Sequence, residues 1–294
     1  MKSRLAYVLT DAPQQRSHWT NDRATKLVAQ ISSLVRIQGS ASLLIFGPAG
    51  AGKASLAISI VGQLSSQMPK LRRVRVDCES IALLPDVRGK WADELAERSE
   101  AEATLFEGQP KGWLVVLDQL DALTRDRSLS PVSARIWESV QSIWHSSRES
   151  DPGANPTVIV ATCRDPSTMP AQMLDRFDLM HYLAPLALNE VEGLISDVVI
   201  SSQFLEAGQA RIVASNVSRL LADSKVARVG VGGFLRGLSE GVRWETPGTI
   251  TPDDFARRIC VAGSASLFDQ HTVSTYESRN QSYIDQSDLL SRLS

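Results

Sequence analysis

Two short stretches of this sequence hold residues whose types and spacing suit phosphate chemistry. The first reads Gly47, Pro48, Ala49, Gly50, Ala51, Gly52, Lys53, Ala54 and Ser55. Small residues in such a loop let backbone N–H groups surround an anion at the start of a helix, while the lysine amine neutralises the outer phosphates. An apolar run at 41–46 precedes it and a helical pattern follows, which is the setting of a P-loop. A glycine-rich turn with a chance lysine is the simpler alternative, and the full spacing argues against it.

The residue after the lysine departs from a complete P-loop. That position is normally Ser or Thr, whose hydroxyl ligates a magnesium ion that bridges two phosphates. Ala54 has no hydroxyl. Ser55 comes next, but one residue along a helix turns the side chain by about 100°, so it should not reach the same place. We therefore predict binding of ATP or ADP, and of Mg²⁺ at a site that lacks one of its usual ligands.

The second stretch is an apolar strand, 113–118, that ends in Asp118. This is the form of a Walker B motif, in which the aspartate holds the metal. Gln119 follows, and an amide can orient a water molecule but cannot accept its proton as a general base. Asp118 and Gln119 are thus the predicted catalytic positions, and Asp118 is the predicted metal ligand. The alternative is that Asp118 only ends a buried strand.

The pattern around these motifs predicts an α/β fold. Apolar residues at helical spacing indicate a helix over 27–35, and short apolar runs at 41–46, 74–76, 113–117 and 157–162 indicate strands. Strands that alternate with helices imply a parallel sheet. Beyond Pro185 the apolar residues recur at helical spacing throughout.

We accordingly expect four parts. These are an N-terminal extension (1–20), a P-loop α/β nucleotide-binding domain (21–185), a small all-helical domain (186–270) and a polar, partly disordered C-terminal tail (271–294).

Composition narrows the function further. Among 294 residues, 33 acidic and 31 basic side chains nearly balance, so no overall field attracts nucleic acid or an anionic membrane. The basic cluster at 70–75 favours a strand edge blunted by charges over a nucleic-acid contact. Three widely spaced cysteines argue against a disulfide framework and a zinc site. No apolar run has the length of a membrane span, so we expect a cytoplasmic protein.

Taken together, the motifs resemble the AAA family. The resemblance rests on Gly47 to Ser55, on 117–123 (LDQLDAL), on 160–164 (VATCR) and on 174–178 (LDRFD). It extends to the segments 230–235 and 250–255, which look like the helical lid of such modules. It therefore implies an AAA+ parallel-sheet sandwich followed by a small helical lid. Val76, Asp77 and Cys78, with the LDxLD form of the acidic strand, look most like the first ATPase ring of type II members such as the peroxisome-biogenesis ATPases and N-ethylmaleimide-sensitive factor.

The resemblance also implies roles for individual residues. Cys163 stands where the family has a polar sensor near the γ-phosphate, and a thiol is a weak donor there. Arg176 matches an arginine that reaches into the neighbouring subunit's site, which would require an oligomer. Where the family often has an aromatic pore-loop residue this sequence has Val87, with Trp91 nearby.

Three functions remain open at this stage. The first is a nucleotide-dependent structural or regulatory subunit of an oligomeric AAA assembly, such as a hexameric ring, with weak or absent hydrolysis; Ala54, Gln119 and Cys163 all favour it. The second is an active ATPase that remodels or extracts a protein client, peroxisome-biogenesis-like and peripheral to an organelle, with Ser55 or Asp121 in a substituted role. The third is a DNA-associated initiator or clamp-loader type of AAA+ protein, against which the charge balance counts.

Overall fold

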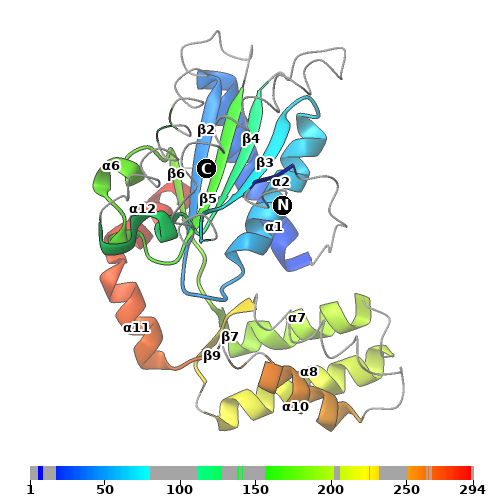
Figure 1. Cartoon of the computed structure of the whole chain (residues 1–294). Helices are drawn as coiled ribbons and strands as arrows, with labels where there is room; N and C mark the ends of the chain where they lie inside the picture. The colour runs from blue at the N-terminus through cyan, green and yellow to red at the C-terminus, as the bar shows by residue number, and fades with distance from the viewer. Residues whose placement is uncertain are drawn as a thin grey trace, which may run out of the picture.

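The computed structural model describes residues 6–8, 18–79, 112–127, 138, 141, 156–201, 206–224, 226–231, 251–262, 264 and 267–292. Figure 1 shows a twisted sheet with helices on both faces and a separate group of helices below it. No described helix is both long enough and apolar enough to cross a membrane. Residues 86–91, where a pore loop was expected, lie outside the described residues.

The main sheet has six strands in the spatial order β1-β3-β4-β5-β2-β6. Strand β1 pairs antiparallel with β3, and all other neighbours are parallel. The strands are β1 (Ala6–Val8), β2 (Ser40–Phe46), β3 (Arg72–Asp77), β4 (Trp113–Asp118), β5 (Thr157–Cys163) and β6 (Leu179–Tyr182). The predicted parallel α/β sheet is confirmed.

Two neighbouring strands of the sheet, β2 and β5, are buried along their whole length. Every residue of β2 and β5 is buried, as expected for parallel strands covered on both faces. One face packs against α1 (His18–Gln38) and α2 (Lys53–Gln67). The other packs against η1 (Leu120–Arg127), α6 (Ala171–Leu174) and residues from the end of the chain, with a short turn η2 (Pro166–Thr168) beside them.

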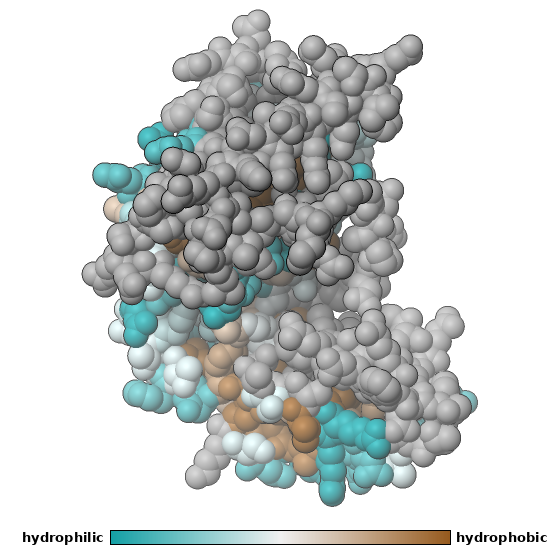
Figure 2. Space-filling model, viewed as in Figure 1, coloured by the Kyte–Doolittle hydropathy of each residue, from teal (hydrophilic) through white to brown (hydrophobic). Residues whose placement is uncertain are grey.

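The small domain follows β6 and has its own hydrophobic core. It contains α7 (Leu188–Ser201), α8 (Ala207–Asp223) and α10 (Pro252–Ala262). Three two-residue strands, β7 (Leu186–Ala187), β8 (Arg228–Val229) and β9 (Leu267–Phe268), form a small antiparallel sheet. The domain is thus mostly helical rather than all-helical, because periodicity cannot reveal strands of two residues. Figure 2 shows hydrophobic side chains on this domain beside hydrophilic ones.

The end of the chain is helical, so the expectation of a partly disordered polar tail was wrong. Helix α11 (Gln270–Arg279) starts at Asp269, whose side chain accepts a hydrogen bond from the Thr272 N–H. Helix α12 (Gln281–Arg292) then lies against β6. Ile284 joins the sheet's hydrophobic cluster, and the Ser287 hydroxyl accepts a hydrogen bond of 2.9 Å from the Tyr182 N–H.

The strand order determines where a ligand can sit. From β2 the chain continues to β3, towards one edge of the sheet. From β5 it continues to β6, at the opposite edge. In open α/β sheets, such a reversal leaves a crevice beyond the carboxyl ends of the two adjacent strands. Both predicted motifs lie at this edge, since the P-loop follows β2 and Asp118 ends β4, which neighbours β5.

Candidate functional site

The phosphate loop, residues 47–52, connects the end of β2 at Phe46 directly to the start of α2 at Lys53. Gly47 has φ 155°, and a Cβ there would lie 2.4 Å from the Leu183 carbonyl oxygen, so only glycine fits. Gly52 immediately precedes α2 with φ 99°, a left-handed conformation that glycine adopts without strain. The helix N-terminus therefore points its free N–H groups and positive dipole end at the loop, which makes an anion-binding site. Ala54 is half-buried and Ser55 is exposed.

Lys53 lies within this loop rather than in solvent. Its amine donates hydrogen bonds of 2.7 Å to the Gly47 carbonyl and 2.9 Å to the Pro48 carbonyl. Burial lowers the pKa of Lys53 to about 8, although Cys163 and Asp121 act in the opposite direction. The amine is thus still mostly protonated at neutral pH. A buried cation gains most from a nearby anion, which a phosphate would supply.

Asp118 has both carboxylate oxygens engaged within the protein. Oδ1 accepts a hydrogen bond of 2.7 Å from the Thr162 hydroxyl on β5. Oδ2 forms a short ion pair with the Arg75 guanidinium on β3. The Thr162 hydroxyl in turn accepts a hydrogen bond of 2.9 Å from the Gln119 N–H. Three neighbouring strands are thereby joined at their carboxyl ends.

Gln119 is held in a strained conformation. Its φ is 57°, and it is the one non-glycine residue with a positive φ among the described ranges. Such strain costs of order 1–2 kcal/mol and is typical of functional sites. The side-chain amide donates to Glu79 (2.8 Å) and accepts from Arg164 (2.7 Å). Arg164 also lies 3.7 Å from Glu79, so these three side chains form a closed ring of contacts.

The donor set does not fit the magnesium ion that a Walker motif implies. Mg²⁺ is held by carboxylate, hydroxyl and water oxygens in near-octahedral geometry. Ala54 offers no oxygen from its side chain, and Asp118 already has a guanidinium on one oxygen and a hydroxyl on the other. No group of three or more His, Cys, Asp or Glu side chains suited to a metal occurs within the described part of the chain.

Two further side chains lie near Lys53. Cys163 is fully buried, and burial raises the pKa of its thiol well above the ordinary value, so it stays neutral. Asp121 is partly buried, which raises the pKa of its carboxyl, and its Oδ1 has no hydrogen-bond partner among the described residues. Cys163 is thus a neutral, buried thiol within electrostatic range of Lys53, and its sensor role stays a prediction.

Arg176 is separated from this chain's own phosphate loop. It precedes β6, and its backbone carbonyl accepts a hydrogen bond of 3.1 Å from the Ser42 hydroxyl, near the start of β2. The phosphate loop begins after Phe46, which is four strand residues beyond Ser42 and therefore roughly 13 Å from it. Arg176 itself is exposed. The backbone of Arg176 therefore lies at the opposite end of β2 from the phosphate loop of the same chain.

The basic cluster at 70–75 proved not to be a strand edge. Strand β3 lies between β1 and β4. The Arg72 guanidinium stacks over Trp113 at 5.3 Å, and Arg75 is paired with Asp118. Arg72 and Arg75 are thus engaged within the protein.

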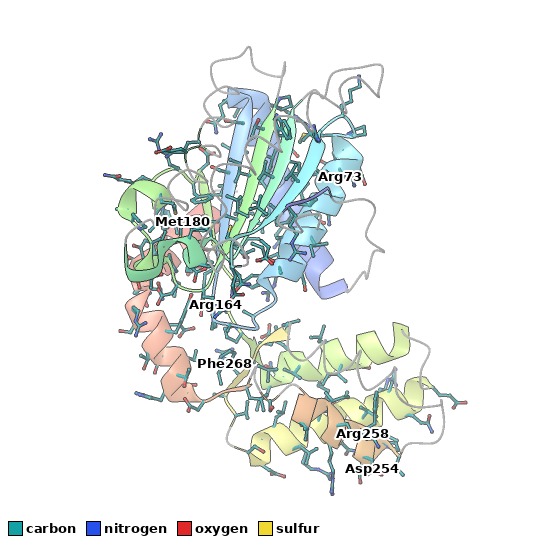
Figure 3. The ribbon with its side chains drawn as sticks, in the orientation of Figure 1. Arg73, Arg164, Met180, Asp254, Arg258 and Phe268 are labelled. Atoms are coloured by element: carbon teal, nitrogen blue, oxygen red, sulfur yellow. The ribbon has the colours of Figure 1, made fainter. Side chains whose placement is uncertain are left out.

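Sequence reasoning missed the part that the last helices play at the site. The Tyr276 hydroxyl donates a hydrogen bond of 2.6 Å to the Arg164 carbonyl, and Arg279 lies 3.2 Å from Asp165. Figure 3 shows Arg164 at the end of the sheet that faces the small domain. Helix α11 therefore supports the loop that carries the partner of Gln119. The signal was present as Asp269, a helix-capping residue three positions before Thr272.

A comparison with family models decides the classification. Residues 43–184 match the family described as "ATPase family associated with various cellular activities (AAA)". This chain contains an AAA domain. The match spans the phosphate loop, Asp118, Gln119 and Arg176, and ends where the small domain begins.

Solved AAA structures share the fold at low sequence identity. The FIGL-1 AAA domain in complex with ADP has a TM-score of 0.53 and 13% identity, covering 96% of this chain and 94% of that one. The ORC2 protein of Aeropyrum pernix has a TM-score of 0.56 and 16% identity, covering 90% and 72%. A chain of the E. coli MS115-1 HORMA:CdnC:Trip13 complex has a TM-score of 0.58 and 12% identity, covering 87% and 93%. No curated protein sequence matches this chain.

Proposed function

We propose that this AAA module binds ATP and ADP and works as a nucleotide-dependent structural or regulatory subunit of an oligomeric AAA assembly, with weak or absent hydrolysis. Nucleotide binding is supported by the phosphate loop, its buried lysine and the free helix N-terminus at the carboxyl edge of the sheet. The ADP in the FIGL-1 relative is consistent with the same site.

The conformation of Gln119 is the observation that carries the proposal of weak hydrolysis. A water molecule that attacks a phosphate needs a group to accept its proton. The Gln119 amide cannot accept one, and both its nitrogen and its oxygen are already bonded, to Glu79 and Arg164. Nucleotide can still do work without being cleaved, because a ligand shifts a conformational equilibrium by its differential affinity for the two states.

The position of Arg176 supports the oligomer. The residue is exposed, and its backbone lies near the start of β2, whereas the phosphate loop follows the end of β2. A second AAA subunit placed against this face would receive that arginine at its nucleotide. The partner is therefore another AAA chain, identical or different. The peroxisomal setting, the protein client and the type II placement follow from the resemblance alone and stay predictions.

Calorimetric titration with ADP and ATP tests the binding site. We expect Lys53→Ala to abolish the binding heat, because it removes the buried cation of the loop. Lys26→Ala is the matched control, since Lys26 is an exposed lysine on α1, and it should bind as the wild type does. Binding that survives in Lys53→Ala would show that the nucleotide lies elsewhere.

An active ATPase is the second candidate, and Glu79 favours it. This carboxylate lies 2.8 Å from the Gln119 amide nitrogen, close to where a general base is required. If Glu79 accepts the proton, steady phosphate release should be measurable and should fall by about 10² or more in Glu79→Gln, the usual size of a general-base contribution. Under the first proposal phosphate release is weak or absent, and Glu79→Gln should not lower it.

A further inference from the structure

We propose that Arg75 takes the place of magnesium in this site, so that the protein binds nucleotide without a divalent cation. The inference rests on the proposed nucleotide binding and goes beyond it, because it assigns to a residue of β3 the charge that a metal ion supplies in a complete Walker site.

The position of Arg75 is determined by strand pairing on both sides. In the register of the sheet, Arg75 lies opposite Tyr7 on β1 and opposite Val116 on β4. Asp77, two residues on, lies opposite Asp118. Side chains two residues apart on a strand share a face, so Arg75 and Asp118 lie on the same face as diagonal neighbours. This is the face that α1 and α2 cover, and α2 begins at Lys53.

Both carboxylate oxygens of Asp118 are already engaged by other side chains. Arg75 occupies Oδ2 and the Thr162 hydroxyl occupies Oδ1. A divalent ion would have to displace the Arg75 guanidinium, which is only partly exposed. The backbone of Arg75 is fixed because its strand, β3, pairs with β1 on one side and β4 on the other. The ion would also meet that guanidinium as a like charge at close range, which is unfavourable.

The start of α2, directly after the phosphate loop, also lacks the side chain that would bind magnesium. The second protein oxygen of a Walker magnesium site comes from the residue after the lysine, and here that residue is Ala54. Both protein contacts of the metal are therefore lost, one by substitution to alanine and one by pairing with an arginine. The negative charge of Asp118 acts to raise the pKa of Lys53. The Arg75–Asp118 pair therefore lies within electrostatic range of the phosphate loop. The loop N–H groups, Lys53 and Arg75 together supply the positive potential that phosphates require.

Titration of the full chain with ADP and with ATP, once in magnesium chloride and once in EDTA, tests the proposal. We expect the affinity in EDTA to equal or exceed that in magnesium. Magnesium that strengthens the wild-type affinity by about tenfold or more, or 1.4 kcal/mol, would overturn the inference while leaving nucleotide binding in place. Absence of binding in both solutions would overturn the proposed function and this inference with it.

A variant makes the test sharper. Arg75→Ser frees Asp118, so magnesium should now strengthen ADP binding, by between about fivefold and 150-fold if the coupling is of ordinary size. Arg73→Ser is the control, because Arg73 lies on the same strand towards its other end (Figure 3) and should leave the wild-type pattern unchanged. Paramagnetic resonance with Mn²⁺ gives a second readout without nucleotide. The inference predicts bound Mn²⁺ in Arg75→Ser but not in the wild type, and the reverse order contradicts it. If Arg75→Ser does not fold, the wild-type titrations still decide.

Discussion

The Tyr276 hydroxyl donates a hydrogen bond of 2.6 Å to the backbone carbonyl of Arg164. This contact links helix α11 to the loop that contains Arg164. The Arg164 guanidinium in turn donates a hydrogen bond to the Gln119 side chain. Burial raises the pKa of Tyr276 far above its ordinary value, so the hydroxyl remains a donor at every pH at which the protein is folded.

Removing this hydroxyl should weaken the fold. We expect Tyr276→Phe to lower the free energy of unfolding by about 1 kcal/mol, the usual net value of one hydrogen bond. Urea denaturation followed by circular dichroism measures the loss. Tyr283→Phe removes a tyrosine hydroxyl from α12 and is the matched control. Equal losses in the two variants would mean that the Tyr276 contact contributes nothing specific.

The last helix should be part of the cooperative fold. Ile284 is 9% exposed and packs in the sheet's hydrophobic cluster, whereas Leu289 on the same helix is 59% exposed. Ile284→Ala should therefore cost about 2 kcal/mol or more. Leu289→Ala should stay within about 0.5 kcal/mol of the wild type. Similar small values for both would indicate that α12 does not stabilise the domain.

The site residues could be predicted only in part from the sequence. The phosphate loop, the buried strands and Asp118 are visible because each is a local pattern of neighbouring residues. The pairs Arg75–Asp118 and Gln119–Glu79 join residues 43 and 40 positions apart, and they depend on the register of β3 against β4. No periodicity in the sequence reports that register. For this reason Arg75 was interpreted as part of a solvated strand edge.

The C-terminal helices were missed for a different physical reason. Residues 271–294 are rich in Ser, Gln and Asp, a composition typical of disorder. Among residues 281–289 of helix α12, Ile284 and Ser287 are buried, and the partly buried Tyr283 packs beside them. These two buried positions face β6, the strand at one edge of the sheet, and two apolar or small residues form too weak a periodic signal to predict a helix.

The buried amine of Lys53 should make stability depend on pH. Its pKa is about 8 in the folded protein, below the ordinary 10.5 that applies when unfolded. The unfolded chain therefore binds more protons between these values, so the stability of the wild type rises as pH increases from 8 to 10.5. The 2.5-unit difference corresponds to about 3 kcal/mol.

Comparison with Lys53→Met isolates this effect, because all other groups titrate in both proteins. The variant should be the more stable of the two at neutral pH, and its advantage should shrink across the same interval. Denaturation at a series of pH values measures the difference. A difference that does not change with pH would place the amine in solvent.

Arg176 should matter only between subunits. Arg176→Ala should leave ADP affinity unchanged in the monomer at high dilution, since the backbone of Arg176 lies at the opposite end of β2 from its own loop. In the assembled state it should weaken nucleotide-dependent association, measured by sedimentation velocity with and without ATP. Arg211→Ala, an exposed arginine on α8, is the control. A loss of affinity in the monomer would contradict the trans role.

The fate of bound ATP tests the central claim most directly. Full-length protein in excess is mixed with limiting labelled ATP and magnesium, the reaction is quenched in acid at intervals, and ATP and ADP are separated. If Gln119 and the Arg75–Asp118 pair stall hydrolysis, the protein retains ATP with no more conversion than a Lys53→Ala sample that binds none. Conversion of the bound ATP to ADP well above that control would contradict the account and establish an active ATPase.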